Sequence, residues 1–270
     1  MSSRIALPNR ALIALTGPDW GKFLNGQTTI DAEKIFDAVA AGAHNSLYYG
    51  AFLTPQGKLS GDVFLCPRDA DTVWIDVDAG LRDELFTKLN LFKLRAKVTL
   101  SRPDAQVYAD LEDGLPDPRH SGLFRFYGTD DARGNLSDYT RFRLTQGLAE
   151  PGLDFPKDYL YPIDINLDVL GAIDFKKGCF VGQETTSRMK RRGTIKNRLI
   201  PLIHAAATLS PGAEILSGER RAGEVLASAE GRSLGLMRLD RLASPLTCDG
   251  EALTLSPPEW LAPFVTPLEA

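Results

Sequence analysis

The stretch that decides the fold reads KGCFVGQE and occupies residues 177–184. Two lysines, Lys176 and Lys177, stand directly before Gly178 and the thiol of Cys179, and Gly182 opens a predicted helix. Positive charge and a helix N-terminus both stabilise a thiolate, so this pattern favours a reactive or partner-contacting Cys179. The alternative is a small buried residue that only packs, which is the commoner fate of a free cysteine.

Upstream of this stretch, the sequence alternates between extended and helical patterns. Residues 54–57 (TPQG) form a predicted turn between two extended runs, which is typical of a β-hairpin. Apolar residues recur at helical spacing in 81–94 and strand formers alternate in 72–77. This order of elements predicts an α+β layer. Further strands are expected at 10–16, 46–53, 58–66 and 97–101, with a short helix after residue 18.

Downstream of residue 196, short strand-like runs are separated by Gly and Pro. Their spacing predicts a small C-terminal β-barrel or sandwich. We therefore divide the chain into a first domain at 1–197 and a barrel at 198–270. Two irregular stretches lie within the first domain: 111–122, which we expect to be a linker or surface crossing, and 151–162. The predicted barrel strands are 197–204, 214–216, 222–227, 233–239 and 251–255.

Composition excludes several classes of protein. The net charge of −4 argues against a general nucleic-acid coat and against RNA as a partner. The first twenty residues lack a secretory cleavage pattern, and no apolar run is long enough to span a bilayer. Three widely spaced cysteines make a poor disulfide framework and fit a reducing compartment. We expect a cytoplasmic protein without a membrane partner.

The histidines do not predict a metal site. His44, His120 and His204 are isolated, and no Cys-x-x-Cys or His-x-x-x-His spacing occurs. Motifs for a nucleotide phosphate loop and for a nucleophilic serine are absent as well. We expect no bound metal.

Residues 177–184 match the signature Lys-Gly-Cys-aromatic-x-Gly-Gln-Glu at every fixed position, and the chain resembles the YgfZ family of T-protein relatives. Residues 161–167 (YPIDINL) look like that family's Pro-x-Glu-x-Asn-Leu element, and 26–28 (GQT) and 53–58 (LTPQGK) look like its N-terminal motifs. The resemblance implies an α+β T-protein-like fold, two subdomains around a central folate cavity, and a C-terminal β-barrel. It also implies tetrahydrofolate as cofactor and a role in assembling or maintaining iron–sulfur proteins.

Two carboxylates are candidates for holding folate, because a carboxylate accepts two parallel hydrogen bonds from the edge of a pterin ring. Asp164 stands where the family element has a glutamate one methylene longer, which leaves open a direct contact, a bridging water or an altered pose. Asp62 lies in an extended run with apolar residues on both faces and resembles the catalytic aspartate of the T-protein. A solvated turn residue and an edge-strand charge are the respective alternatives. We extend the predicted folate contacts to Lys177, Gln183, Glu184 and Arg188.

The basic run at 188–198 contains six cations and no acid. It fits a solvated helix end, a landing site for a polyglutamylated folate tail, a site for an acidic partner, or a site for RNA phosphates.

The first predicted function is a folate-binding accessory factor whose partners are iron–sulfur proteins or their assembly machinery, with Cys179 as the key residue. The second is a folate-dependent aminomethyltransferase or demethylase, in which Asp62 carries catalysis. The third is a module that only binds folate, and the residues leave open whether any reaction is catalysed.

Overall fold

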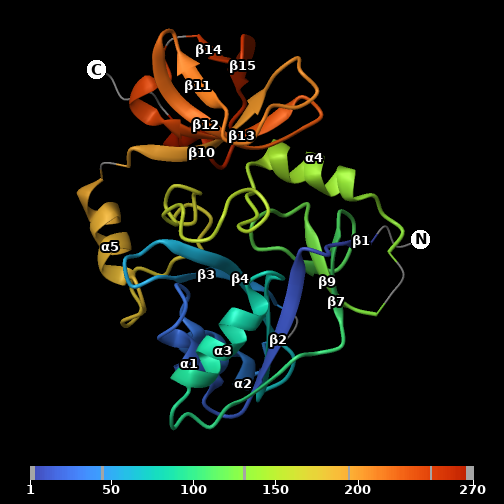
Figure 1. Ribbon diagram of the computed structural model, residues 1–270. Helices are drawn as coiled ribbons and strands as arrows, with labels where there is room; N and C mark the ends of the chain where they lie inside the picture. The colour runs from blue at the N-terminus through green and yellow to red at the C-terminus, as the bar shows by residue number, and fades with distance from the viewer. Residues whose placement is uncertain (1–3, 44–45, 130–131, 194, 244, 266–270) are drawn as a thin grey trace.

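A computed structural model describes residues 4–43, 46–129, 132–193, 195–243 and 245–265. Figure 1 shows a sheet-and-helix layer at one end of the molecule, a β-barrel at the other, and irregular chain between them. Within the described residues, no helix combines the length and the apolar character needed to cross a membrane.

The larger open sheet has five antiparallel strands in the order β3-β4-β5-β2-β6. Strand β4 shows how the sequence positions its residues, because successive side chains point to opposite faces. Val63 and Leu65 pack into the core beneath the helices, whereas Phe64 packs into a second core on the other face. The strands are β2 (Arg10–Thr16), β3 (Tyr48–Leu53), β4 (Leu59–Pro67), β5 (Thr72–Asp78) and β6 (Thr99–Ser101), and the helices are α1 (Trp20–Asn25), α2 (Ala32–Ala40) and α3 (Arg82–Phe92).

A smaller sheet with the order β1-β7-β9-β8 stands beside the first, and helix α4 leads from it toward the barrel. Between α4 and α5 the chain forms turns without regular structure, as expected for 151–162. Buried apolar side chains of this segment, such as Ile165 and Leu167, form one core with Phe64 and with Leu199 of the barrel. The elements are β1 (Ile5–Ala6), β7 (Gln106–Asp110), β8 (Leu115–Pro116), β9 (Phe124–Gly128), α4 (Leu136–Gln146) and α5 (Gln183–Arg192).

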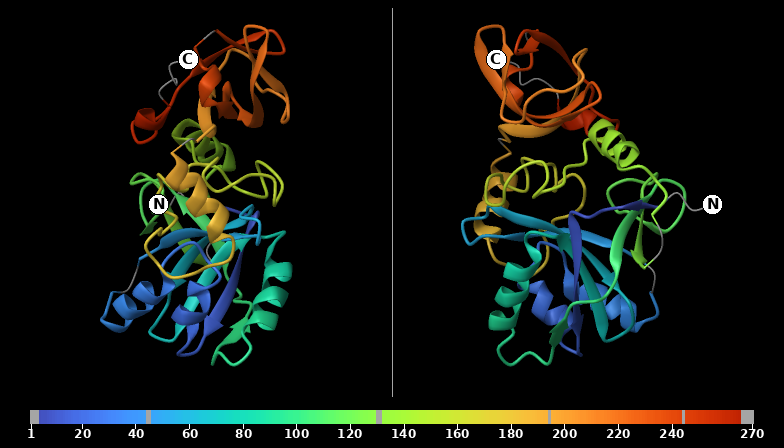
Figure 2. Two further views of the ribbon diagram at one scale, coloured as in Figure 1. Left: turned by 90° about the vertical axis from the view of Figure 1, so that its left-hand side faces the viewer. Right: turned by 45° about the vertical axis from the view of Figure 1, so that its right-hand side comes forward.

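The C-terminal strands close into a six-stranded barrel in the order β10-β13-β12-β11-β14-β15. Two views in Figure 2 place this barrel over the irregular segment and away from the large sheet. The strands are β10 (Asn197–Ile203), β11 (Glu214–Ser217), β12 (Arg220–Ala229), β13 (Arg232–Arg238), β14 (Leu246–Cys248) and β15 (Glu251–Leu255), and two short 3-10 helices are η1 (Leu239–Arg241) and η2 (Ala262–Phe264).

The α+β fold class with a C-terminal β-barrel is confirmed, but one local prediction is wrong. The segment 111–122 is not a simple surface crossing: it contains β8, and the side chains of Asp117 and Arg119 are buried. Pro, Gly and charge predicted exposure there, but these two charges pair with each other inside the protein. Ion pairing is the usual reason why charged side chains are buried at all.

Candidate functional site

The Cys179 loop is the point where distant sequence motifs meet. The Val181 amide donates to the carbonyl of Gly26 at 3.2 Å, which joins 177–184 to the GQT motif. Gly182 has φ of +80°, and a Cβ there would lie 2.5 Å from the carbonyl oxygen of Thr54. Glycine is therefore required for the TPQG turn to pack against the start of α5. Three motifs that are far apart in sequence form one structural unit.

Lys177 holds this unit together from inside. Its ammonium donates to the carbonyl oxygens of Asn25, Thr28 and Ile30 at 2.5, 2.8 and 2.6 Å. Burial lowers the pKa of Lys177 to about 8. A lysine has three N–H donors, and all three are used here. The ammonium is therefore directed at the N-terminal loop, and its predicted contact with folate stays a prediction.

Cys179 is exposed, whereas Cys66 and Cys248 are buried. Burial raises the pKa of both buried thiols, which makes them poorer nucleophiles. Lys176, next to this loop, is exposed as well. Exposure of Cys179 fits a reactive or partner-contacting thiol better than a packing residue.

Two further residues that we predicted to contact folate, Gln183 and Glu184, lie at the start of α5 and have different structural roles. Gln183 accepts a hydrogen bond from the Phe180 amide at 3.2 Å and so stabilises the loop that leads into the helix. Glu184 is exposed in the first helical turn, where a carboxylate complements the helix dipole. Neither residue lines the cleft described next.

A cleft of about 520 Å³ lies between α5, residues 159–164 and the barrel. Helix α5 presents to it one stripe at helical spacing, namely Thr185, Arg188, Met189 and Arg192. The opposite wall carries tyrosines and a lysine, and Asp164 lies among the lining residues. The structure thus brings two predicted contacts, Asp164 and Arg188, to one cavity. Its volume is in the range of sites for small organic ligands.

Asp164 is buried at this cleft, with only 6% of its surface exposed. Its carboxylate accepts from the amide of Tyr161 at 3.0 Å, and burial raises the pKa of the carboxyl group. Lys58 lies 3.9 Å from the centre of the Tyr161 ring and donates to the carbonyl of Tyr159 at 2.9 Å. Asp164 is therefore an organised carboxylate with aromatic and cationic neighbours, not a solvated turn residue.

The basic run divides into two groups. Lys190 and Arg198 bind the carboxylate of Asp168 at 3.1 and 2.6 Å, and Arg198 is buried. Within the parts of the chain that the structure describes, no salt bridge is found for Arg188, Arg192 or Lys196, which line the cleft. These three cations can meet an anionic ligand in the cleft, whereas Arg191, the sixth cation of the run, bonds to the carbonyl of Ser187 at 3.4 Å and does not line it.

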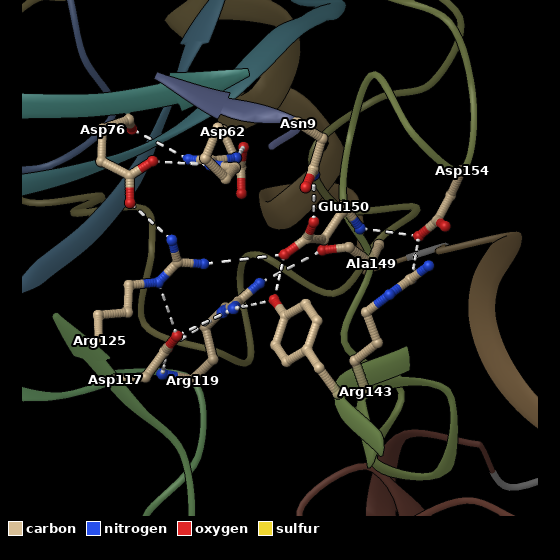
Figure 3. Close-up of polar contacts among 12 residues, drawn as sticks. Asn9, Asp62, Asp76, Asp117, Arg119, Arg125, Arg143, Ala149, Glu150 and Asp154 are labelled. Carbon is tan, nitrogen blue, oxygen red and sulfur yellow. Dashed lines mark hydrogen bonds and ion pairs between the residues drawn. The ribbon is translucent and has the colours of Figure 1, made fainter. Parts of the chain in front are cut away.

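Asp62 has a different environment, shown in Figure 3. Its side chain has no exposed surface, and Arg10 binds one of its oxygens at 2.6 Å. The second oxygen, Oδ2, has no hydrogen-bond partner. Burial raises the pKa of Asp62 against the opposing charge of Arg10. Asp62 does not line the cleft that holds Asp164, so the two carboxylates do not share that cavity.

The ion pair of Asp62 belongs to a buried network that no sequence pattern predicts. Arg10 and Arg125 both bind Asp76, at 2.7 and 2.6 Å. Asp117 pairs with Arg119 at 2.9 Å and with Arg125 at 3.1 Å. The ring of Phe64 lies 3.7 Å from the Arg125 guanidinium. Figure 3 shows Asp76, Asp117 and Arg125 converging from different elements of the fold.

The network continues to Glu150, which accepts from Asn9 at 2.6 Å and from the hydroxyl of Tyr139. Burial opposes ionisation of Glu150, but Arg143 and Arg10 outweigh it and hold its pKa at about 2. The members come from segments that lie far apart in the chain, such as Arg10 and Asp76, which are 66 residues apart, so only the fold could reveal the network.

The histidines act in local structure. His120 accepts through Nδ1 from the amide of Gly122 at 2.9 Å, and His204 bonds to Ser233 at 2.8 Å. His44 lies outside the described residues. Among the residues that are described, no three His, Cys, Asp or Glu side chains form a group that could hold a metal ion.

Comparison with known proteins begins with the barrel. Residues 196–263 match the family model described as the CAF17 C-terminal β-barrel domain. The structure resembles the crystal structure of glycine cleavage system aminomethyltransferase T from Bartonella henselae, with a TM-score of 0.70 over 94% of this chain and 84% of that chain. Sequence identity to it is 14%, so this likeness concerns the fold alone. The predicted T-protein-like fold is confirmed.

The curated relatives are named as iron–sulfur cluster assembly factors. The chain is 33% identical over 229 residues to the mitochondrial IBA57 homolog of Phaeosphaeria nodorum, which covers 73% of this chain and 54% of the relative. It is 30% identical over 237 residues to that of Mycosarcoma maydis, covering 77% and 59%. The chain therefore spans little more than half the length of these relatives. Mitochondrial IBA57 of Mus musculus is 29% identical over 300 residues, covering 94% and 84%.

These relatives contradict the cytoplasmic location that we predicted, because they are all named as mitochondrial. The absence of a recognisable secretory signal carries no information on a mitochondrial location. The names do not mention folate, and the YgfZ family stays a prediction at that finer level. At the level that the comparisons support, the chain is similar in sequence to IBA57 iron–sulfur cluster assembly factors, has a T-protein-like fold, and ends in a barrel that matches the CAF17 barrel model.

Proposed function

We propose that this protein supports the assembly or maintenance of iron–sulfur enzymes and that Cys179 is the residue through which it acts on a partner. The observation that carries the proposal is the exposure of Cys179 on an anchored loop, while Cys66 and Cys248 are buried. A single thiol supplies one of the four cysteine ligands of a typical cluster. Cys179 would therefore act together with ligands of an assembly partner. The relatives' names favour a mitochondrial site of action, which cell fractionation tests.

Tetrahydrofolate is the cofactor that we propose for the cleft at Asp164. An organised carboxylate suits the N–H groups of a pterin edge, and the nearby tyrosine rings suit a flat heterocycle. Arg188, Arg192 and Lys196 suit the carboxylates of a folate tail, one glutamate or several.

The environment of Asp62 favours this accessory role over one-carbon transfer. A carboxylate that orients folate during transfer must touch it, whereas Asp62 is buried against Arg10. We therefore do not propose aminomethyl transfer for this chain.

The test is complementation of cells that lack the protein. Wild type should restore the activities of iron–sulfur enzymes, and Cys179→Ala should fail although its melting temperature is unchanged. Lys97→Met, altered at an exposed lysine outside the Cys179 loop, is the control and should restore activity. Full restoration by Cys179→Ala would refute the proposed role of the thiol.

A further inference from the structure

The loop that carries Cys179 is held on both sides but not at the cysteine itself. Before it, the Asp174 amide donates to the carbonyl of Thr29 at 2.9 Å, and after it the Val181 amide donates to Gly26 at 3.2 Å. A Cβ added at Gly178 would meet no atom within 4 Å. The position of the thiol therefore depends on what fixes its flanks to the loop at 25–30.

Lys177 is the side chain that joins these two loops. Its ammonium reaches across to the end of α1, where the carbonyl of Asn25 is available, and to the carbonyls of Thr28 and Ile30. The last carbonyls of a helix lack intrahelical partners and carry partial negative charge, so a lysine there is favourable. One lysine nitrogen thus contributes three charge-assisted hydrogen bonds between the two loops, whereas the backbone contributes two neutral ones. Charge-assisted hydrogen bonds are the stronger kind.

We propose that Lys177 is a positioning residue, whose ammonium fixes the Cys179 loop onto residues 25–30 and so presents the thiol from a rigid base. This inference rests on the proposed role of Cys179. It assigns to Lys177 neither a ligand contact nor direct electrostatic activation of the thiol, since its three donors all face carbonyl oxygens.

The charge of Lys177 is required for this geometry. A neutral amine has two N–H donors and a lone pair, so it cannot serve three carbonyl acceptors. Burial lowers its pKa to about 8, and the charged groups that oppose this shift are Asp31, Asp174 and Glu33. Lys34 pairs with two of them, at 2.9 and 3.3 Å. Anchoring of the loop should therefore weaken as the pH rises through about 8.

The first experiment measures amide hydrogen exchange by NMR in the full chain. Lys177→Met should speed exchange of the Asp174 and Val181 amides by about tenfold or more relative to wild type. Lys176→Met is the matched control, because Lys176 is exposed and, among the residues that the structure describes, only its backbone amide makes a hydrogen bond, to Asp174 at 2.7 Å; this variant should exchange as wild type does. Equal exchange in the two variants would overturn the proposal.

Two further measurements separate positioning from activation and from loss of fold. The pH midpoint of Cys179 alkylation should be the same in wild type and Lys177→Met; a raised midpoint in the variant would show that Lys177 activates the thiol directly and would overturn the proposal. In wild type alone, exchange of the two amides, corrected for intrinsic base catalysis, should rise between pH 7 and pH 9. Exchange rates of the wild-type amides that do not change between pH 7 and pH 9 would also overturn the proposal. This measurement does not depend on whether Lys177→Met folds. Failure of Cys179→Ala to impair iron–sulfur enzymes refutes the proposed function but leaves these exchange results standing.

Discussion

Replacing Asp117 by asparagine removes the negative charge between two buried arginines while keeping the shape of the side chain. Asp117 accepts from Arg119 through both oxygens, at 3.0 and 2.9 Å, and from Arg125 at 3.1 Å. All three side chains are 1% exposed or less. The variant therefore removes the carboxylate partner of buried Arg119 and one of the two close carboxylate partners of buried Arg125, and breaking a buried ion pair in this way is costly.

The magnitude follows from the ionisation of Asp117. Burial alone would raise its pKa, but Arg119 and Arg125 outweigh burial and lower it from 3.8 to about 2. That shift corresponds to roughly 2–3 kcal/mol of stability contributed by the charged form. Arg125 keeps Asp76 at 2.6 Å, but among the described residues Arg119 has no other carboxylate partner, so we expect a loss of about 3–5 kcal/mol at pH 7. The folded pKa is depressed, so the contribution is present above pH 3.8 and is lost as pH falls through about 2. The difference in the free energy of unfolding between wild type and Asp117→Asn should therefore decrease as the pH falls from 3.8 to about 2.

Urea unfolding at several pH values between 7 and 2.5 measures this difference. The matched control is Asp138→Asn, because Asp138 pairs with Arg141 at 2.8 Å but both side chains are about half exposed. The control should change stability by less than about 0.5 kcal/mol. A loss below about 1 kcal/mol for Asp117→Asn, or a difference that does not change with pH, would refute the view that this network stabilises the fold through its charges.

Four further outcomes are expected. Asp164→Ala should weaken tetrahydrofolate binding by about 1–3 kcal/mol in calorimetry, and unchanged affinity would remove Asp164 from the site. Arg188→Gln should reduce affinity for polyglutamylated folate more than for the monoglutamate, and only at low salt; equal losses would count against a tail contact. Cys179 should alkylate faster near neutral pH than either buried thiol in mass-spectrometric labelling, and equal rates would argue against a reactive thiol. Gly182→Ala should lower stability by about 2 kcal/mol or more in thermal melts, because the left-handed backbone and the turn at 54–57 exclude a Cβ; an unchanged melting temperature would contradict this close packing.

Elements with strong local patterns could be predicted from the sequence. The hairpin around 54–57 and the short barrel strands combine alternation with turn residues, and the structure has strands there. Gly182 opens the helix predicted to carry Gln183, Glu184 and Arg188, and the structure has α5 there, ending at Arg192. Helices α2 and α4 were missed although Asp31 and Asn135 cap them through side-chain bonds. Capping signals of this kind could have found them.

The site was harder to predict because its parts depend on tertiary contacts. Motif spacing singled out Cys179, and the structure places it on the surface as a functional thiol requires. Alternation in β4 correctly placed Asp62 on the face opposite Val63, but no local pattern could reveal Arg10 as its partner, 52 residues away. Similarly, Lys177 was expected to act on its neighbour Cys179, whereas its acceptors lie about 150 residues earlier in the chain. Reasoning from sequence assigns interaction partners among residues that are close in the chain. A buried charged group must be paired, and its partners can come from any segment that the fold brings next to it.

The pairing of Arg10 with Asp62 bears on how a T-protein-like fold can serve in iron–sulfur assembly. A guanidinium offers a carboxylate the same kind of N–H donors that the edge of a pterin offers. Here the guanidinium comes from the chain itself and is held at 2.6 Å from Asp62 and 2.7 Å from Asp76, with both side chains closed to solvent. The Asp62 carboxylate thus stabilises the interior through its ion pair. Its second oxygen, Oδ2, has no hydrogen-bond partner, which costs free energy that a buried water would offset. Under the function that we propose, the chemistry is carried by groups at the surface of the protein. Cys179, exposed at the meeting point of three motifs, is the group that the fold presents for it.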